Sequence, residues 1–503
     1  MSDLAPFLIA LPILGSVVAL LIGLARSETG WPVAVVAMIG QTGLAAWLAY
    51  QVFTGGPIEY VVGGFEVPYG IELVIDGLSA SMIVLIATVA LGVLAYAHAA
   101  GPRSNPFYGT YLLLVAGLTG VCITGDVFNM YVFLEITGLA AYALVASGRS
   151  GRSAVAALKY LIVGTVGASL FLLGVGYAYI ATGTLNMADL AAKLAAVGYT
   201  STLVQTAFAF VVIGLFIKVA VFPLHTWQPE AYAGAPDSVS AFIAALVSTV
   251  GAYALARMIL SVFTVDFLAA NPLARDLLVA GAMVSIVAGS ALAVAQTEIK
   301  RMLAYSSVSQ FGLVLAALSV TNRTALIGAA VHLVGHAIMK GGLFLTAGLV
   351  ATGTGARTVD GYEGLSDRMP IAAGAFAVLA LAMVGVPPMV GFAGKWYIAL
   401  GAIEAQIWPL AVVILASTLL TLAYFARLIE RMYFREAASV GDGPTAEAET
   451  GSPTGDAVLA DGGRVTAGMY LAVLAAAVLA ATLGVAVVEY GRLLEPTLEL
   501  LLA

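Results

Sequence analysis

A single acidic residue stands inside a long apolar stretch in the first half of this sequence. Glu135 lies in the run 128–137, and no basic residue lies within a helical turn or two of it. An ionised side chain in the hydrocarbon core of a bilayer is costly unless it is paired or reaches water. We therefore expect Glu135 to carry a proton or to form an ion pair, with a structural polar contact as the alternative.

A lysine without a local counter-charge lies further along the chain. Pro223 follows Lys218 by five residues, and it cannot donate a backbone hydrogen bond to the carbonyl of Val219. The helix should therefore break or kink one residue past the lysine. Broken helices at membrane depth line cavities, and transporters use them to bind ions. We predict that Lys218 pairs with Glu135 and that separating them moves a proton; a lysine reaching the membrane interface is the alternative.

The same combination recurs in the second half of the chain. Lys395 follows Pro387 and Pro388 and several glycines, so this span is also expected to be interrupted. Two interrupted segments with one lysine each predict internal repeats, although the two halves show no strong sequence identity.

Between these two segments, His332, His336 and Lys340 have the spacing i, i+4 and i+8. On a helix this spacing places them along one stripe, about 6 Å apart per step. Histidine titrates near neutral pH and relays protons, and with Lys340 the stripe predicts a hydrated proton path. Hydrogen-bonded core histidines are the alternative. Two histidines at i, i+4 can also bind a metal, but no HExxH glutamate is present.

The composition indicates which elements must position these groups. Of the 503 residues, 61% are hydrophobic and 10% are charged, whereas a soluble domain has about 25% charged residues. Apolar segments of about 18–28 residues recur throughout and predict an all-α polytopic membrane protein with about fourteen transmembrane helices. The expected spans are 4–24, 31–53, 75–97, 108–125, 127–147, 155–181, 203–223, 237–262, 274–296, 302–320, 325–352, 371–400, 407–432 and 466–488.

The remaining charges set the orientation. Most of the 21 lysines and arginines fall in loops on the side opposite the N-terminus, so the positive-inside rule predicts a multi-pass protein of the cell membrane with both termini outside. Five charged residues lie at predicted span ends, where solvent or helix capping satisfies them: Asp126, Asp237, Glu298, Lys300 and Arg301.

Two segments lie outside the predicted spans. Residues 57–76 alternate apolar and polar groups around Gly63-Gly64, which predicts a short β-hairpin on the outer face. Residues 436–463 are rich in glycine, alanine, threonine and acidic residues and contain no lysine or arginine, which predicts a disordered acidic linker.

Motifs for cofactors are absent from the sequence. Cys122 is the only cysteine, so neither an intrachain disulfide nor a CxxC metal site can form. P-loop and dinucleotide fingerprints are also missing. We expect no bound cofactor, no metal site and no nucleic-acid partner, and we expect that the chain is not an enzyme on its own.

With these residues in hand, the chain resembles the antiporter-like subunits shared by Mrp-type sodium/proton antiporters and respiratory complex I, and most of all the D subunit of the Mrp type. The resemblance runs from about Gly64 to Arg435. It rests on the histidine block and on four signatures: Tyr69-Gly70-Ile71-Glu72-Leu73 with Asp76-Gly77-Leu78-Ser79-Ala80, Asp126-Val127-Phe128-Asn129 with Phe133-Leu134-Glu135-Ile136, Ile217-Lys218 with Phe222-Pro223-Leu224-His225-Thr226-Trp227, and Gly385-Val386-Pro387-Pro388 with Gly391-Phe392 and Gly394-Lys395-Trp396.

The resemblance implies a fold of fourteen helices with two inverted five-helix repeats and two broken helices. The first repeat would occupy 108–262 and the second 274–435. The N-terminal helices and outer hairpin would occupy 1–107, and a C-terminal helix would occupy 464–503 after the linker.

The resemblance also implies roles for residues. Glu135 and Lys218 match the family's glutamate–lysine pair, and Lys395 matches the terminal lysine of its proton path, with the histidine block between them. Thr249 takes the place of a central lysine that the family often has. A threonine can hydrogen-bond to water but cannot carry a proton as an ammonium does, so this link depends on water or is interrupted.

Three functions follow as hypotheses. The first is a subunit of an Mrp-type antiporter that translocates protons and sodium or another monovalent cation. The second is the equivalent proton-pumping subunit of complex I or of a membrane-bound hydrogenase. The third is a non-transporting scaffold that lost the path at Thr249. In each case the partners are the lipid bilayer and the other subunits of a hetero-oligomeric membrane complex.

Overall fold

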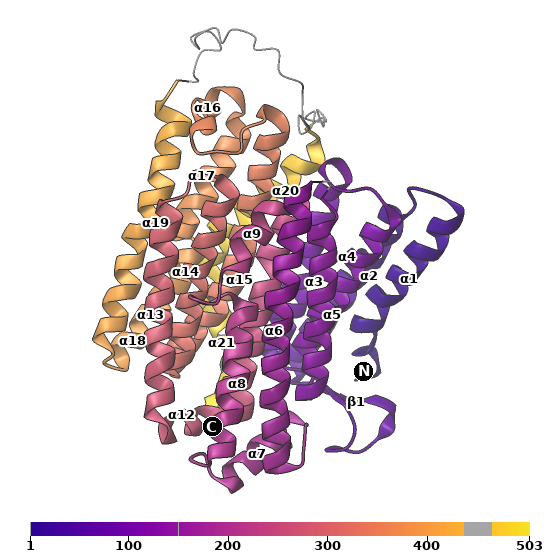
Figure 1. Cartoon of the computed structure of the whole chain (residues 1–503), viewed down its shortest axis with the longest axis vertical. Helices are drawn as coiled ribbons and strands as arrows, with labels where there is room; N and C mark the ends of the chain where they lie inside the picture. The colour runs from indigo at the N-terminus through magenta and orange to yellow at the C-terminus, as the bar shows by residue number, and fades with distance from the viewer. Residues whose placement is uncertain (1, 149, 437–464, 503) are drawn as a thin grey trace.

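The structure, a computed structural model, describes residues 2–148, 150–436 and 465–502. Long helices running side by side make up nearly all of it (Figure 1). In these ranges, 13 helices are long and apolar enough to cross a membrane. The remaining predicted span, 371–400, is a broken helix made of α17 (Pro370–Val384) and α18 (Val390–Glu404). The prediction of an all-α polytopic membrane protein with about fourteen spans is therefore confirmed.

The N-terminal part contains three membrane-length helices and the only strands among the described residues. The strands β1 and β2 pair antiparallel, with Ile58 opposite Ile75, so the predicted hairpin is confirmed. Asp76 follows β2 and caps α3, accepting hydrogen bonds from the backbone N–H groups of Leu78 and Ser79. The elements are α1 (Phe7–Ala25), α2 (Gly30–Gly55), β1 (Ile58–Val61), β2 (Glu72–Ile75) and α3 (Gly77–Ala100).

Two groups of helices follow, here called repeat 1 and repeat 2. Repeat 1 comprises α4 (Asn105–Ile123), α5 (Val127–Ala146), α6 (Gly151–Thr182), α7 (Met187–Val197), α8 (Thr202–Val219), α9 (Trp227–Gly234), α10 (Asp237–Phe242), the π-helical η3 (Ile243–Val247), α11 (Ser248–Arg257), the π-helical η4 (Met258–Phe263) and α12 (Thr264–Ala270). Repeat 2 comprises α13 (Pro272–Val294), α14 (Ile299–Val320), α15 (Arg323–Thr354), η5 (Asp360–Tyr362), α16 (Leu365–Arg368), α17, α18 and α19 (Trp408–Phe434).

The backbone shows that the two groups are copies of one arrangement. Asp126 pairs with Asn186 in repeat 1, and Glu298 pairs with Thr358 in repeat 2, so both partners are displaced by the same 172 positions. The same displacement relates α6 to α15, which are both 32 residues long. Helix α7 of repeat 1 and helix α16 of repeat 2, which correspond under the same displacement, lie at opposite ends of the bundle (Figure 1). The repeats are therefore inverted with respect to each other.

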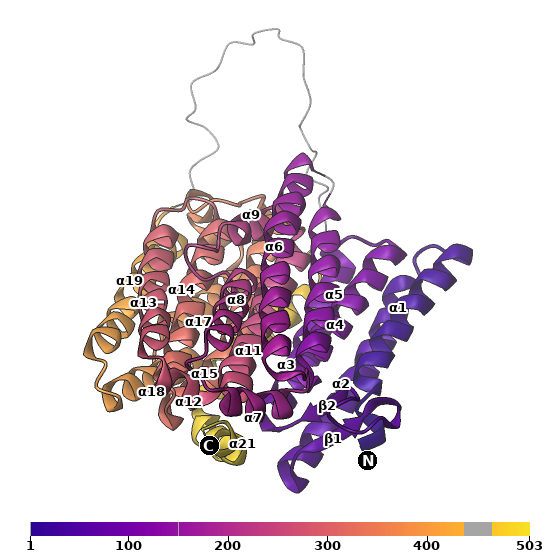
Figure 2. The ribbon, with the colours of Figure 1, turned by 60° about the horizontal axis from the view of Figure 1, so that its bottom comes forward.

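The last span is longer than the predicted segment 466–488. It consists of α20 (Ala467–Thr482), a short 3₁₀ turn η6 (Leu483–Ala486) and α21 (Val487–Leu502). Both ends of the chain lie at the same end of the bundle (Figure 2), as an even number of crossings requires. The predicted linker at 436–463 lies, apart from its first residue, outside the described residues.

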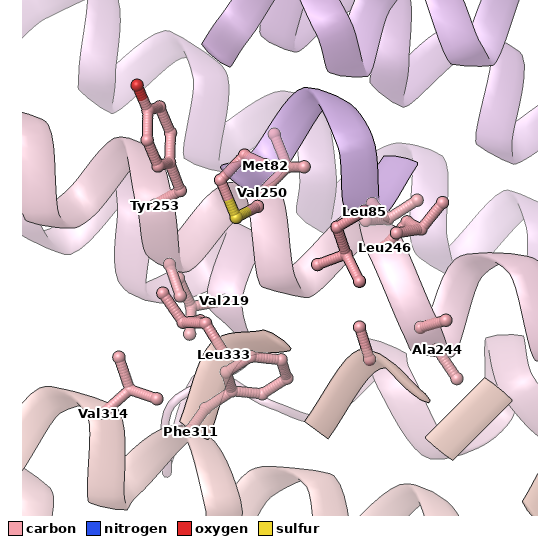
Figure 3. Close-up of a cluster of buried hydrophobic side chains, with 14 of the residues drawn as sticks. Met82, Leu85, Val219, Ala244, Leu246, Val250, Tyr253, Phe311, Val314 and Leu333 are labelled. Atoms are coloured by element: carbon pink, nitrogen blue, oxygen red, sulfur yellow. The ribbon is translucent and has the colours of Figure 1, made fainter. Parts of the chain in front are cut away.

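Apolar side chains fill the junction between the repeats. Val219 and Val250 of repeat 1 gather there with Phe311, Val314 and Leu333 of repeat 2 (Figure 3), and each is at most 3% exposed. Packing of this kind excludes water. This part of the contact between the repeats is therefore apolar, whereas salt bridges such as Asp237–Lys300 join the repeats elsewhere.

Candidate functional site

The first break in the helices lies where Pro223 predicts it. Helix α8 ends at Val219, and Ala220 adopts a left-handed backbone conformation with φ of 66°. The N–H of Val221 donates to the Phe216 carbonyl at 3.0 Å, and the N–H of Phe222 donates to the Ser285 hydroxyl at 3.2 Å. Backbone groups freed by the break thus find partners inside the protein, which is what permits a break at this depth.

The predicted ion pair forms beside this break. The Lys218 Nζ atom lies 3.3 Å from the Glu135 Oε1 atom, and the two side chains are 11% and 24% exposed. Lys218 lies in the last turn of α8, whereas Glu135 comes from the middle of α5. The lysine is thus directed towards a carboxylate within the bundle. A snorkelling lysine, the alternative interpretation, does not match this geometry.

A small cavity borders the lysine. It has a volume of about 10 Å³, close to the least that holds one water molecule. Its lining includes the polar residues Lys218, Thr137 and Tyr160, and the other lining residues are Leu134, Gly138, Val247, Val250 and Gly251. The pair therefore adjoins a space in which one water could bind.

The second break has a similar backbone but a different charge arrangement. Helix α17 ends at Val384, Gly385 is left-handed with φ of 98°, and α18 begins at Val390. The Lys395 ammonium reaches back across this break and donates to the carbonyls of Met383 at 2.8 Å and Val384 at 3.1 Å. Within the described ranges, Lys395 has no carboxylate partner. Its charge is compensated only by the carbonyl end of α17.

The histidine block lies in the middle of α15, as its spacing predicts. His332, His336 and Lys340 are each at most 1% exposed, and the two imidazole centroids lie 6.4 Å apart. The Lys340 ammonium donates to the Leu303 carbonyl at 2.6 Å and to the Ser306 hydroxyl. None of the four imidazole nitrogens has a hydrogen-bond partner among the residues that the structure describes. Within the described residues, the structure thus shows no direct hydrogen bond to protein of the kind that the alternative interpretation, hydrogen-bonded core histidines, requires. Among the residues that the structure describes, no three His, Cys, Asp or Glu side chains lie close enough together to hold a metal ion.

Thr249 is less suited to a link than the sequence suggested. It is fully buried, and its hydroxyl donates to the Ala245 carbonyl of its own helix at 2.7 Å. Its oxygen can only accept a further hydrogen bond in this arrangement. The apolar cluster of Figure 3 lies close by, since Val250 is the next residue. The structure brings Glu135 and Lys218 together, but it shows no polar contact from Thr249 to the histidines.

Sequence reasoning missed one charged pair near the hairpin. Arg257, which lies inside the expected span 237–262, has a side chain only 12% exposed and forms a salt bridge with Asp76 at 2.5 Å. The arginine also donates to the Tyr253 hydroxyl, which in turn donates to the Cys122 carbonyl at 2.6 Å. The spacing of Tyr253 and Arg257, one helical turn apart, was the available signal.

A second buried pair corrects the prediction that the charges at span ends are solvated. Asp237 and Lys300 lie 2.5 Å apart with side chains 13% and 8% exposed. Lys300 also donates to the Ala235 carbonyl and to the Ser240 hydroxyl. Asp126 does cap α5, as predicted, by accepting a hydrogen bond from the N–H of Asn129. Nothing in the sequence near Asp237 identifies a partner 63 positions away.

The sequence was compared with protein families and with known proteins. A profile of the family described as "NADH:quinone oxidoreductase/Mrp antiporter, TM" matches residues 124–421. The chain is 48% identical over 418 residues to the N subunit of the NADH-quinone oxidoreductase of Desulforudis audaxviator (strain MP104C), covering 82% of this chain and 81% of that protein. It is 32% identical over 392 residues to the D subunit of the Na(+)/H(+) antiporter of Bacillus subtilis (strain 168), covering 77% and 78%.

A solved structure extends the likeness to the whole fold. A chain of the Mrp complex from Dietzia sp. DQ12-45-1b superposes with a TM-score of 0.87 at 26% identity, over 100% of this chain and 99% of that one. The profile covers more than half of this chain, and both sequence relatives exceed 30% identity. The chain therefore belongs to the NADH:quinone oxidoreductase/Mrp antiporter transmembrane family and is an antiporter-like transporter subunit of the Mrp or complex I type.

Proposed function

We propose that the chain is a proton-translocating subunit of a multi-subunit sodium/proton antiporter of the Mrp type. The observation that carries the proposal is the Glu135–Lys218 pair, whose charged atoms lie 3.3 Å apart beside the break that follows α8. A charged pair next to interrupted backbone is the usual form of an ion site in transporters. The likeness to the D subunit of an antiporter in sequence, and to an Mrp complex in structure, supports the same proposal.

The pair supplies a mechanism for taking up and releasing a proton. A proton that reaches Glu135 neutralises the carboxylate, removes most of its attraction for the Lys218 ammonium and lets the two side chains separate. Release of the proton restores the carboxylate, and the pair forms again. The cavity of about 10 Å³ beside Lys218 can hold a single water that delivers the proton.

Repeat 2 supplies the rest of the proposed path. Protons would pass between Lys340, His336 and His332 along α15 and leave at Lys395. The four side chains are buried and at most 5% exposed, so they are separated from bulk water. Buried ionisable groups within membrane spans mark proton relays, and this supports the assignment.

The proposal includes the setting of the chain. It would work in the cell membrane with both termini outside, beside other subunits of a hetero-oligomeric complex. Protons would be exchanged for sodium or another monovalent cation, and no resident cofactor is needed for that exchange. The structural relative is itself one chain of a complex, which supports the presence of partners.

A second candidate is the equivalent subunit of an electron-driven complex such as complex I or a membrane-bound hydrogenase. The 48% identity to a protein named as an NADH-quinone oxidoreductase subunit favours it. The two candidates differ in what drives the proton. In vesicles that hold the isolated complex, a sodium gradient would move protons in the first case, and only an electron donor with an acceptor would do so in the second.

A non-transporting scaffold is the third candidate. The hydrogen bond of Thr249 to its own helix and the apolar cluster of Figure 3 favour it, because neither offers a group that passes a proton on. In that case the Glu135–Lys218 pair would be purely structural, and its removal would affect assembly rather than flux.

Sodium-dependent proton flux tests the proposal in vesicles that hold the whole complex. The native chain is compared with Lys218→Ala and with Lys193→Ala. Lys193 is the matched control because it forms a surface pair with Asp189 on α7, at 2.8 Å. Flux should stop with Lys218→Ala and persist with Lys193→Ala while both complexes assemble. Full flux with Lys218→Ala would contradict the proposal.

A further inference from the structure

Repeat 2 contains a buried glutamine, Gln310. Its counterpart in repeat 1 is a residue that lies next to Lys218. Gln310 lies 172 positions after Gly138, the displacement that relates the two repeats. A Cβ atom placed on Gly138 would lie 3.4 Å from the Lys218 Nζ atom. In repeat 1, this position therefore borders the ammonium of the ion pair. In repeat 2, a glutamine side chain fills it.

Both polar atoms of this glutamine lack a partner. Gln310 is fully buried in α14, and neither its Nε2 nor its Oε1 atom has a hydrogen-bond partner in the described part of the chain. An unsatisfied buried amide is costly, so native proteins rarely leave one without a partner or an ordered water. The Gln310 amide is therefore available to bind a neighbouring polar group or an ordered water.

The helix register places Gln310 at the level of His336. Helices α14 and α15 are joined by a two-residue connection, so they run antiparallel. Lys340 bonds to Leu303 and Ser306 of α14. One turn back along α15 is His336, and one turn on along α14 from Ser306 is Gln310. The ring of Phe311, the next residue, lies 4.6 Å from the His336 imidazole between centroids.

These observations give two unsatisfied groups at one level of the bundle. The imidazole of His336 has no partner on either nitrogen among the described residues, and the Gln310 amide offers both a donor group, its NH₂, and an acceptor, its carbonyl oxygen. An amide can therefore serve either tautomer of the imidazole, directly or through one water. A neutral amide does not itself change charge, so it orients the ring without competing for the proton.

We propose that Gln310 is a positioning residue that orients the His336 imidazole between Lys340 and His332. The inference rests on the proposed function, because it concerns the repeat 2 part of the proton path. The other titratable groups that face this segment are His332 and Lys340 of α15, Lys395 of α18 and Tyr424 of α19, whose hydroxyl lies beside Ser306. Gln310 differs from all of these because it cannot titrate.

Proton flux in vesicles with the whole complex tests this role with three variants. Gln310→Leu removes the amide at similar volume, and we expect flux to fall by about tenfold or more, less than the roughly 10²–10⁴-fold loss typical of a group that itself transfers the proton. Gln41→Leu is the matched control, since Gln41 is also fully buried but lies in α2, outside both repeats, and bonds to the Leu8 carbonyl. This control should keep its flux.

Gln310→Glu separates positioning from packing. A carboxyl can also bond to an imidazole, so flux should persist, but its pH profile should shift because a titrating group now faces His336. A native rate with Gln310→Leu would overturn the inference, and so would an unchanged pH profile with Gln310→Glu.

If the complex with Gln310→Leu fails to assemble, Gln310→Met replaces it, because methionine also lacks the amide and has a side chain of similar length. Lys218→Ala is measured beside them: flux that survives Lys218→Ala refutes the proposed function, whereas flux that stops there but survives Gln310→Leu refutes only this inference.

Discussion

The two broken helices have nearly the same backbone but hold their lysines differently. After each break the N–H of the residue following the left-handed position donates to a carbonyl five residues back, Val221 to Phe216 and Val386 to Leu381. At the first break a carboxylate faces the ammonium of Lys218. At the second, Lys395 contacts only backbone carbonyls. The fold has thus been repeated, whereas the charge compensation has not.

This difference shows where charge can change in each repeat. A carboxylate and an ammonium compensate each other fully, so a proton arriving at the first break alters the pair as a unit. Carbonyls supply only partial charges, so Lys395 has no partner that a proton can neutralise. We infer that repeat 1 responds to proton binding by separating a pair, and that repeat 2 passes protons between isolated bases.

The largest expected effect comes from removing one side of the pair. Glu135→Gln leaves the Lys218 ammonium without its carboxylate, and breaking a buried pair costs about 3–5 kcal/mol, reduced here because Glu135 is 24% exposed. We expect proton flux to be abolished. Combining Glu135→Lys with Lys218→Glu restores a pair of opposite polarity and should recover part of the flux. Equal loss in the single and double variants would show that the pair does not act as a unit.

Removal of the lysine at the second break should have a smaller effect on stability. Lys395→Met deletes an ammonium held by carbonyls alone, and an apolar side chain of similar length avoids the cost of burying a charge. We expect flux to fall strongly while the thermal unfolding temperature of the complex stays within a few degrees of native. A loss of stability as large as that of Glu135→Gln would mean that the two breaks are not different in this respect.

A smaller effect, on stability alone, is expected from adding a methyl group to a closely packed glycine at the second break. A Cβ atom at Gly391 would collide with the Ala382 carbonyl oxygen, whereas nothing lies within 4 Å of a Cβ atom at Gly374. Gly391→Ala should therefore destabilise the protein by about 1–3 kcal/mol, as overpacking does, and Gly374→Ala should not. Thermal unfolding of the purified complex measures both. Equal behaviour of the two variants would contradict the described geometry of the break.

The smallest effects are expected from substitutions at the two residues with a left-handed backbone, where alanine is replaced by glycine at one break and glycine by alanine at the other. Ala220 and Gly385 have φ of 66° and 98°, a conformation that costs roughly 1 kcal/mol for a residue with a Cβ atom. Ala220→Gly should stabilise slightly or be neutral, since glycine also loses more entropy on folding. Gly385→Ala should destabilise by about 1 kcal/mol. Effects of the same sign at both positions would show that the breaks differ in backbone as well as in charge.

Part of this arrangement could be predicted from the sequence because its causes are local. Apolar runs predict the spans, and Pro223 predicts the break next to Lys218. The spacing of His332, His336 and Lys340 predicts their shared face. A charged lysine and a charged glutamate are both costly to bury in an apolar environment unless they are paired, so the pairing of Lys218 with Glu135 could also be inferred.

The rest depends on contacts between distant segments. The pairs Asp76–Arg257 and Asp237–Lys300 join residues 181 and 63 positions apart, and no local pattern links their members. Gln310 carries no charge and has no motif of its own, so only the displacement between the repeats shows its position. The apolar cluster in which Val219 and Val250 meet Phe311 and Leu333 could not be predicted either, because the sequence does not distinguish these residues from other apolar residues of the spans.

The central claim is that a proton binds at the Glu135–Lys218 pair during transport. Infrared difference spectroscopy on the assembled complex in vesicles tests it most directly, comparing the native chain with Glu135→Gln under an imposed proton gradient. We predict a carbonyl band of a protonated carboxylic acid that appears in the native complex and is absent from the variant. A band of equal size in both complexes would contradict the account, because the proton would then bind elsewhere.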